Sequence, residues 1–343
     1  MTAARLDGLD LVALQRFFAE SEVSTTGDLR AELISGGKSN LTYRVFDDAS
    51  QWVLRRPPTA GLTPSAHDVA REYRVCAALQ DSPVPVAPTV VLCEDESVMG
   101  APFAVTGFVD SRVIRTVDDL ATLSDVEIAS CTDELVRVLA ALHDVDYRAV
   151  GLEKFGRPDG YLTRQVALWA RQWERVKTRE LPDLERLHGL LADAIPATSQ
   201  SAIVHGDYRI DNTLVATDDP GRVVAVVDWE MSTLGDPLSD LAQMCVYRHP
   251  ALDVILGEPA AWTSTRLPST DDLAQKYATT TGRAIDHWSF YLGLANFKLA
   301  VIAEGITHRH REGATTGEGF AQAHEAVPPL VAAGLAALGE GTR

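Results

Sequence analysis

The spacing of apolar residues changes near residue 110, and this change limits the folds open to the chain more than any other feature. Before it, the strand-like runs are residues 29–34, 41–46, 51–56, 89–93 and 102–109, with helical patterns at 10–21 and 64–79. After it, helical spacing dominates, at residues 125–143, 162–177, 184–194, 238–247, 271–279, 288–304 and 319–338, with two strand-like stretches at 203–215 and 222–228. Alternation predicts strands and a 3.6-residue repeat predicts helices. We therefore expect an α+β fold, with a small sheet-rich part over residues 1–109 and a larger helical part over 110–343.

Length and composition agree with a globular protein of two parts. The 343 residues suffice for about two domains. Apolar residues make up 46% and charged residues 23%, which excludes a mainly disordered chain. No run of about 18 uncharged apolar residues predicts a membrane-spanning helix. The first ten residues include Arg5, Asp7 and Asp10 and no apolar segment, so we expect no signal peptide and a cytoplasmic location.

The charge is acidic along the whole chain. There are 31 basic and 48 acidic residues, a net charge of −17, and residues 1–110 carry 9 basic against 15 acidic residues. Such a chain repels phosphate backbones, so we expect no nucleic-acid partner. The acidity serves solubility or attracts a cationic substrate. The four cysteines, Cys76, Cys93, Cys131 and Cys245, show no paired spacing, and we expect buried, reduced thiols.

The densest polar cluster, residues 205–212, reads His-Gly-Asp-Tyr-Arg-Ile-Asp-Asn and lies between two apolar runs. A second cluster, Asp-Trp-Glu, follows the strand-like run that ends near Val227. A hairpin would bring Asn212 and Asp228 side by side, and such oxygen ligands suit Mg²⁺. Asp207 would then accept a proton from an attacking hydroxyl. A lone aspartate at a strand end is otherwise typical of turns and helix caps.

This pattern, H-G-D-x-x-x-x-N followed by D-x-E, resembles the catalytic and metal loops of the aminoglycoside phosphotransferase and choline kinase group. The resemblance covers roughly residues 30–310 and implies the bilobal protein-kinase-like fold, ATP and Mg²⁺. It implies that Asp207 orients and deprotonates a small-molecule hydroxyl, while Asn212 and Asp228 hold Mg²⁺. Glu230 replaces an aspartate that is common in the family, and it would contact a second metal ion directly or through water.

The resemblance also assigns the nucleotide site in the first part. The loop that contains Gly37, Ser39 and Asn40 lies where the family covers the phosphates, although two glycines before a lysine also suit a simple hairpin turn. The backbone of Gly107 and Val109, by position only, would contact adenine.

Arg55 stands where the family usually places a lysine on the third strand, and Glu72 stands where its partner glutamate is expected. A guanidinium can bind phosphate and carboxylate in a fork, but it is not the point charge of a lysine. Either Arg55 substitutes for the lysine or the ATP site is weaker. The adjacent Arg56 should point to the opposite face of the strand.

Residues around these positions support the catalytic loop rather than binding a ligand. Gly-Asp-Pro-x-x-Asp at residues 235–240 resembles a segment of the same group, and Asp236 and Asp240 can cap a helix and accept bonds from the loop. We interpret His205 as structural, with a general-base role as the alternative.

A narrower resemblance concerns the acceptor. Residues 53–58, 64–67, 71–75 and 84–86 resemble the kinase-like domains that are fused to, or encoded beside, acyl-CoA dehydrogenases. That subgroup implies phosphorylation of hydroxylated acyl groups. The aromatic side chains Trp169, Trp173, Trp288, Phe290 and Tyr291 form either helix core or an apolar wall for such an acceptor.

We therefore expect an ATP- and Mg²⁺-dependent kinase acting on the hydroxyl of a small molecule, with a hydroxyacyl compound favoured over an aminoglycoside. Aminoglycoside O-phosphotransferase activity is one alternative. An ATP-binding pseudokinase without turnover, favoured by Arg55, is another, and a metal-dependent phosphohydrolase is a third. The sequence carries no information on the oligomeric state.

Overall fold

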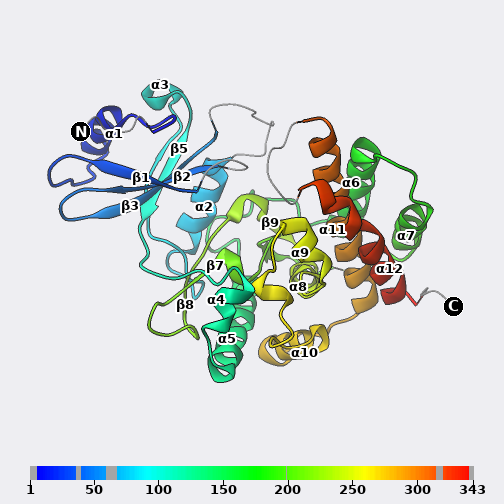
Figure 1. Ribbon diagram of the computed structural model, residues 1–343. Helices are drawn as coiled ribbons and strands as arrows, with labels where there is room; N and C mark the ends of the chain where they lie inside the picture. Colours follow the sequence, from blue (N-terminus) through cyan, green and yellow to red (C-terminus); the bar gives the residue numbers. More distant parts are fainter. Residues whose placement is uncertain (1–5, 36–39, 59–67, 198, 314–319, 340–343) are drawn as a thin grey trace. The chain divides into compact units, whose positions relative to one another are not determined.

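The computed structural model describes residues 6–35, 40–58, 68–197, 199–313 and 320–339 (Figure 1). Its contacts divide the chain into two compact units, which we describe separately: Met1–Ser111 with Val224–Met231, and Arg112–Val223 with Ser232–Arg343. The domain boundary at residue 109 stays a prediction. The inclusion of Val224–Met231 in the first unit is a feature that the sequence analysis did not propose.

The first unit is built on one antiparallel sheet in the order β1-β2-β3-β5-β4. Its strands are β1 (Arg30–Ser35), β2 (Leu41–Phe46), β3 (Gln51–Arg56), β4 (Thr89–Cys93) and β5 (Phe103–Gly107). Alternate residues of β2 and β3 are buried, so their inward side chains form the core. Tyr43, Trp52 and Phe103 pack there with Leu14 and Phe18 of the N-terminal helix α1 (Leu11–Glu20).

Two further helices belong to this unit, α2 (Val69–Leu79) and α3 (Glu96–Met99). Helix α2 begins later than the expected residue 64, and residues 64–67 lie outside the described residues. Asp68 is its N-cap and accepts a hydrogen bond from the backbone nitrogen of Arg71 at 2.9 Å, which satisfies a donor in the first turn.

The returning segment Val224–Met231 joins the same unit through backbone and side-chain contacts. It contains the last residues of β8 (Val223–Val226) and the 3₁₀ turn η2 (Trp229–Met231). The nitrogen of Val226 donates to the carbonyl of Pro85 at 2.8 Å, and Trp229 is buried against α2. The segment that carries Asp228 is thereby fixed to helix α2 and to the loop that follows it.

The second unit is mainly helical (Figure 1). Its helices are α4 (Val117–Ala121), α5 (Asp125–Asp144), α6 (Tyr161–Val176), α7 (Pro182–Asp193), α8 (Pro237–Val246), α9 (Ala251–Leu256), α10 (Thr270–Thr281), α11 (Trp288–Arg311) and α12 (Val327–Ala337). Short elements between them are β6 (Ala202–Val204), η1 (Ile210–Asn212), β7 (Thr213–Val215), β9 (Thr233–Gly235), η3 (Ala261–Thr263) and η4 (Phe320–Ala326). The expected α+β class, with a sheet-rich first part and a helical second part, is confirmed.

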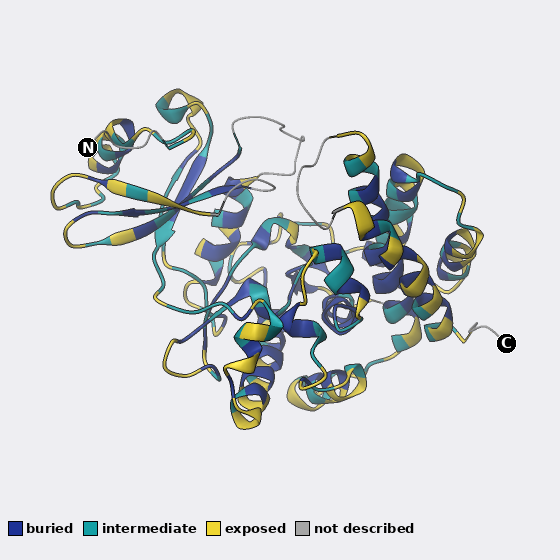
Figure 2. Ribbon diagram, in the orientation of Figure 1, coloured by how far each residue is buried: buried dark blue, intermediate teal, exposed yellow. Residues whose placement is uncertain are grey.

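Helix α11 is the centre of the second unit and packs against α6, α7, α8 and α12. It is long and apolar enough by composition to cross a membrane, but 78% of the 18-residue stretch with this composition is buried inside the protein. A buried core helix meets the same length and composition test, and α11 is drawn mostly dark blue in Figure 2. The burial explains its composition without a membrane.

Two expected elements are interrupted in the structure. The strand-like stretch 203–215 divides into β6, a loop, η1 and β7, because Gly206 adopts a left-handed φ of 83° and the polar side chains that follow leave the strand. The helical stretch 319–338 divides into η4 and α12, since Pro328 and Pro329 lack backbone donors and favour a helix start.

All four cysteines are buried and free. Cys76 and Cys93 lie in the first unit, and Cys131 and Cys245 lie in the second. The burial matches the expectation, and it raises the pKa of the Cys76, Cys131 and Cys245 thiols to about 12, which makes them poor nucleophiles.

Candidate active site

In the first unit, β3 and α2 bring Arg55 and Glu72 together. The Arg55 Nη1 atom lies 2.7 Å from Oε2 of Glu72, and the amide nitrogen of Asn40 donates to Oε1 of Glu72 at 2.8 Å. Glu72 is only 6% exposed. Burial raises its pKa to about 7; the Arg55 guanidinium acts in the opposite direction, and the carboxylates of Asp228 and Glu230 add to the rise. The sequence assigned all of these residues to the nucleotide and metal site.

Asp228 shares the guanidinium of Arg55. Its Oδ1 atom lies 3.5 Å from Arg55 Nη2 and is buried without a hydrogen-bond partner among the described residues. The backbone of Asp228 is left-handed, with a φ of 65°, a conformation that aspartate tolerates better than most residues. The indole nitrogen of Trp229 donates to the carbonyl of Val226 at 2.9 Å and closes the turn around Asp228. A buried carboxylate oxygen held in this way suits a hard cation.

Arg56 points away from this cluster. It is buried, and its guanidinium donates to the carbonyls of Pro57, Met99 and Gly8. Burial lowers its pKa. Its donors are occupied by main-chain oxygens, so Arg55 is the cation of the pair that lies with Glu72 and Asp228.

In the second unit, the loop after β6 carries the predicted catalytic aspartate. Asp240, near the start of α8, accepts hydrogen bonds from the backbone nitrogens of His205 at 2.5 Å and Gly206 at 2.7 Å. Although burial acts in the opposite direction, His143 and these donors hold the pKa of Asp240 below its ordinary value. Asp240 therefore fixes the backbone just before Asp207, the supporting role that the sequence analysis gave it.

Both carboxylate oxygens of Asp207 have partners in this unit. Oδ2 accepts a hydrogen bond from Nδ2 of Asn212 at 2.9 Å, and the same nitrogen donates to the Asp207 carbonyl at 2.8 Å. Oδ1 accepts one from the hydroxyl of Tyr247. Because Asn212 uses its amide nitrogen here, the amide oxygen is the atom that it can offer to a cation.

Tyr247 and Lys298 were not singled out in the sequence. Tyr247 follows Asp240 by seven residues, which places both on one face of α8, and this spacing was a usable signal. The pKa of Tyr247 is raised well above 10 by burial, so its hydroxyl stays protonated and donates. Lys298 of α11 donates to the carbonyl of Gly206 at 2.9 Å. A single lysine within the apolar stretch 288–305 was the corresponding signal.

For the remaining predicted site residues, the structure gives few contacts or none. Gly37 and Ser39 lie outside the described residues. Gly107 donates its backbone nitrogen to the carbonyl of Pro88 at 2.7 Å, and the Val109 carbonyl accepts a bond from the hydroxyl of Ser111 at 3.0 Å. Glu230 contributes to the raised pKa of Arg55, for which burial acts in the opposite direction. The roles of these residues stay predictions.

The donor types fit a divalent cation bound together with phosphates. No group of three or more His, Cys, Asp or Glu side chains arranged for a metal ion occurs in the described part of the chain, so a metal would need oxygens from elsewhere. Mg²⁺ is usually bound by one or two carboxylates, substrate phosphates and water. By chemistry, two groups suit such a cation: the Asp228 carboxylate, whose Oδ1 atom has no hydrogen bond among the described residues although Arg55 lies 3.5 Å away, and the amide oxygen of Asn212.

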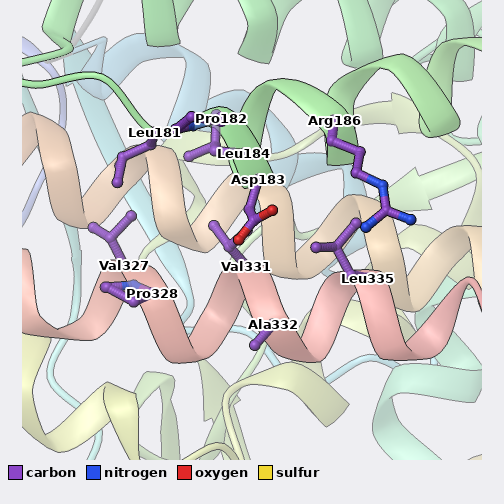
Figure 3. Close-up of a pocket in the computed structure, with 10 residues that line it drawn as sticks. All are labelled: Leu181, Pro182, Asp183, Leu184, Arg186, Val327, Pro328, Val331, Ala332 and Leu335. Carbon is purple, nitrogen blue, oxygen red and sulfur yellow. The ribbon is translucent and has the colours of Figure 1, made fainter. Parts of the chain in front are cut away.

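A separate apolar pocket lies between α7 and α12 (Figure 3). It is lined by Leu181, Pro182, Asp183, Leu184, Arg186, Val327, Pro328, Val331, Ala332 and Leu335. None of the predicted site residues belongs to it. A smaller pocket in the same unit lies beside the catalytic loop and includes Gly206, Trp169 and Lys298.

Comparison with curated proteins identifies relatives that are longer than this chain. "Acyl-CoA dehydrogenase family member 11" of chicken (Gallus gallus) is 35% identical over 318 residues, which cover 90% of this chain and 40% of that protein. "Acyl-CoA dehydrogenase family member 10" of mouse (Mus musculus) is 33% identical over 293 residues, which cover 84% of this chain and 27% of that protein. The chain thus spans less than half the length of these relatives.

Solved structures share the fold. A "putative aminoglycoside phosphotransferase" from Ralstonia eutropha JMP134 is 34% identical and superimposes with a TM-score of 0.84 over 97% of this chain and 99% of that chain. A mutant of the aminoglycoside phosphotransferase APH(4)-Ia, in a ternary complex with ADP and hygromycin B, is 14% identical with a TM-score of 0.61, over 96% of this chain and 100% of that one. At that identity the second likeness concerns the fold alone, and the expected protein-kinase-like fold is confirmed.

A family model described as "Phosphotransferase enzyme family" matches residues 30–272. This range contains the Arg55–Glu72 pair, Asp207, Asn212 and Asp228. The relatives named as acyl-CoA dehydrogenase family members agree with the narrower resemblance, found in the sequence, to kinase-like domains associated with such dehydrogenases. The chain belongs to the phosphotransferase enzyme family.

Proposed function

We propose that the protein is a cytoplasmic kinase that transfers the γ-phosphoryl group of ATP to a hydroxyl of a small hydroxyacyl compound. The observation that carries the proposal is the arrangement of Asp207, whose carboxylate is held by Asn212 and Tyr247 on a loop that Asp240 anchors. A carboxylate fixed in this way can orient a hydroxyl and accept its proton as the phosphoryl group is transferred.

The first unit supplies groups suited to the nucleotide. Arg55, paired with Glu72, would bind the α- and β-phosphates through its fork of donors, and Asp228 with Asn212 would hold Mg²⁺, with Glu230 close to the metal. The ion would neutralise charge on the transferring phosphoryl group. ATP is supported by the ADP complex of the APH(4)-Ia neighbour. The hydroxyacyl acceptor is supported by the relatives named for acyl-CoA dehydrogenases.

The test is an ATP-consumption assay over hydroxy acids, hydroxyacyl-CoA thioesters, aminoglycosides, choline and sugars. We expect turnover with a hydroxyacyl compound. Asp207→Asn should lower turnover by roughly 10²-fold or more, the typical contribution of a positioned general base, with ATP affinity held within a few-fold. Asp228→Ala should weaken Mg²⁺-dependent ATP binding and abolish transfer. Asp218→Asn, at an exposed aspartate of the same unit as Asp207, is the matched control and should behave as the wild type.

Two other functions have a specific observation in their favour. Hygromycin B in the APH(4)-Ia complex supports an aminoglycoside acceptor, and turnover of aminoglycosides without turnover of any hydroxyacyl compound would establish it. The contact of Arg55 with Asp228 supports a pseudokinase, because the guanidinium occupies the carboxylate that a metal would need. Nucleotide binding that is independent of Mg²⁺, with no phosphoryl transfer, would establish that function.

A further inference from the structure

The small pocket beside the catalytic loop has a polar lining that the proposed function has not used. It lies wholly in the second unit and is formed by α6, α8, α11 and Gly206. Trp169 and Leu294 provide apolar surface, while Lys298 and Gln243 provide polar groups. Gly206 immediately precedes Asp207. The Asp207 side chain does not line the pocket, but it acts electrostatically on Lys298, which does.

Lys298 contributes a cation to the lining of this pocket. Its ammonium donates to the Gly206 carbonyl at 2.9 Å and lies 5.7 Å from the centre of the Trp169 ring. An ammonium has three N–H donors. Among the described residues, its contacts are this hydrogen bond to Gly206 and the Trp169 ring. Burial lowers the pKa of Lys298, while Asp207 and Asp240 act in the opposite direction. The charged group is thus held by the loop it faces and has donors to spare.

The buried amide of Gln243 is a second indication, independent of Lys298, that this pocket binds a ligand. It is 2% exposed, and its Nε2 atom is buried with no hydrogen-bond partner among the described residues. Buried amide groups in proteins are nearly always hydrogen-bonded, because an unpaired one loses its bond to water without replacement. Gln243 lines the same pocket as Lys298, so one oxygen-bearing ligand could serve both side chains.

Two strong acceptors of this pocket already have donors. The carboxylate of Asp240 accepts from the backbone nitrogens of His205 and Gly206, and the Gly206 carbonyl accepts from Lys298. Among the described residues, the unpartnered groups that a ligand meets are the Gln243 amide nitrogen and the Ser239 hydroxyl, and both can donate. An amino group of a polycationic acceptor would meet the ammonium of Lys298, and like charges in a buried site repel strongly.

We propose that Lys298 and Gln243 bind the acyl oxygen of the acceptor, the carbonyl or carboxylate that lies a few carbons from the hydroxyl presented to Asp207. This inference rests on the proposed function and names the feature by which the acceptor is recognised. The rest of the acyl chain contacts Trp169 and Leu294. The pocket selects hydroxyacyl compounds over simple alcohols because these lack the oxygen, and over aminoglycosides because of their charge.

The experiment compares three acceptors of equal chain length: a hydroxy acid, its coenzyme A thioester, and the diol in which the acyl group is reduced. Steady-state kinetics are measured for the wild type, Lys298→Met and Gln243→Leu. We expect both substitutions to raise KM for the acyl acceptors about tenfold, the equivalent of one lost hydrogen bond to a charged group. KM for the diol should change less than about twofold. Comparison of the acid with the thioester identifies whether a carboxylate or a carbonyl is bound. The bound group is that of the acceptor with the lower KM in the wild type and the larger rise in KM in Lys298→Met.

The control is Lys276→Met, at a surface lysine of α10 that pairs with Asp133; it should leave all three acceptors unchanged. If Lys298→Met fails to fold, as judged by thermal unfolding, Gln243→Leu and Lys298→Arg carry the comparison. An equal loss on acyl acceptors and diol would show that Lys298 only supports the loop, and would overturn the proposal. So would a wild type that uses the diol as well as the acyl acceptors.

A binding measurement separates this proposal from the proposed function. Calorimetry with the unreactive acyl compound that lacks the hydroxyl needs no turnover. Binding to the wild type that is weakened about tenfold in Lys298→Met supports the acyl-oxygen site even if no acceptor is phosphorylated. Equal binding to both proteins, or no binding to either, contradicts it whatever the kinase assay shows.

Discussion

At the scale of single residues, the geometry of Asp207 depends on a tyrosine from another element. Asn212 lies five residues away and was expected nearby, whereas Tyr247 lies 40 residues further along the chain. Its hydroxyl holds one carboxylate oxygen of Asp207, and its ring lies 5.5 Å below the guanidinium of Arg209. Tyr247 is therefore a positioning residue, because it acts on the reaction through Asp207.

Tyr247→Phe tests this role. The substitution keeps the ring and removes the hydrogen bond to Asp207, so we expect kcat to fall about tenfold, the scale of one bond to a charged group, while the KM for ATP stays within about twofold.

Tyr43→Phe is the matched control for this prediction. Tyr43 is a buried tyrosine of the first unit whose hydroxyl donates to the carbonyl of Asp7, and its replacement should leave kcat unchanged. A Tyr247→Phe enzyme that loses thermal stability, but keeps the wild-type kcat, would assign the hydroxyl a structural role only.

At the scale of elements, strands and long helices were predictable and the connections between them were not. Residues 41–46, 51–56 and 89–93 coincide with β2, β3 and β4, because alternating β-branched and aromatic residues bounded by turn residues specify strands locally. The stretch 203–215 was predicted to be strand-like, whereas only its two ends belong to the strands β6 and β7. Its apolar residues do not reveal that the polar residues between them leave the strand. Turns are decided by particular backbone angles, here at Gly206, that periodicity does not report.

Strand register gives a prediction at this scale. Since β3 directs Arg55 toward Glu72 and Asp228, Arg55→Ala should raise the KM for ATP about tenfold and slow transfer, as expected for a lost charge-assisted contact with phosphate. Arg55→Lys should retain appreciable activity. Arg56→Ala is the control; it should lower the melting temperature, because its guanidinium binds main-chain carbonyls, and leave the KM for ATP unchanged. The reverse result, with Arg55→Ala silent, would mean that the strand faces are exchanged.

At the scale of the whole molecule, the first unit is completed by a segment from far along the chain. Val224–Met231 belongs with Met1–Ser111, and it brings Asp228 to Arg55. The sequence located Arg55, Glu72, Asp207, Asn212 and Asp228 through their motifs. It did not reveal that Lys298, a lone lysine in an apolar stretch, contacts Gly206, 92 residues earlier in the chain, because a local pattern does not name a long-range partner.

The returning segment makes a prediction about folding. A fragment of residues 1–111 loses the buried side chains of Val226 and Trp229. Appending residues 224–231 through a flexible linker should stabilise the fragment by about 3 kcal/mol, the scale for burying large apolar side chains. Urea unfolding followed by circular dichroism measures the difference. The appended segment with Trp229→Ala should recover little of the gain; equal stability of all three fragments would show that the segment contributes nothing to the unit.

The distribution of the four thiols has an experimental consequence. Each unit contains two buried cysteines, and none can react with an alkylating reagent until the structure around it opens. Labelling in the native buffer, followed by peptide mass analysis, therefore times the opening of each unit separately. Modification of Cys76 and Cys93 ahead of Cys131 and Cys245 would identify the first unit as the one that opens more often. The natural cysteines thus report the opening rate of each unit, with no engineered probe required.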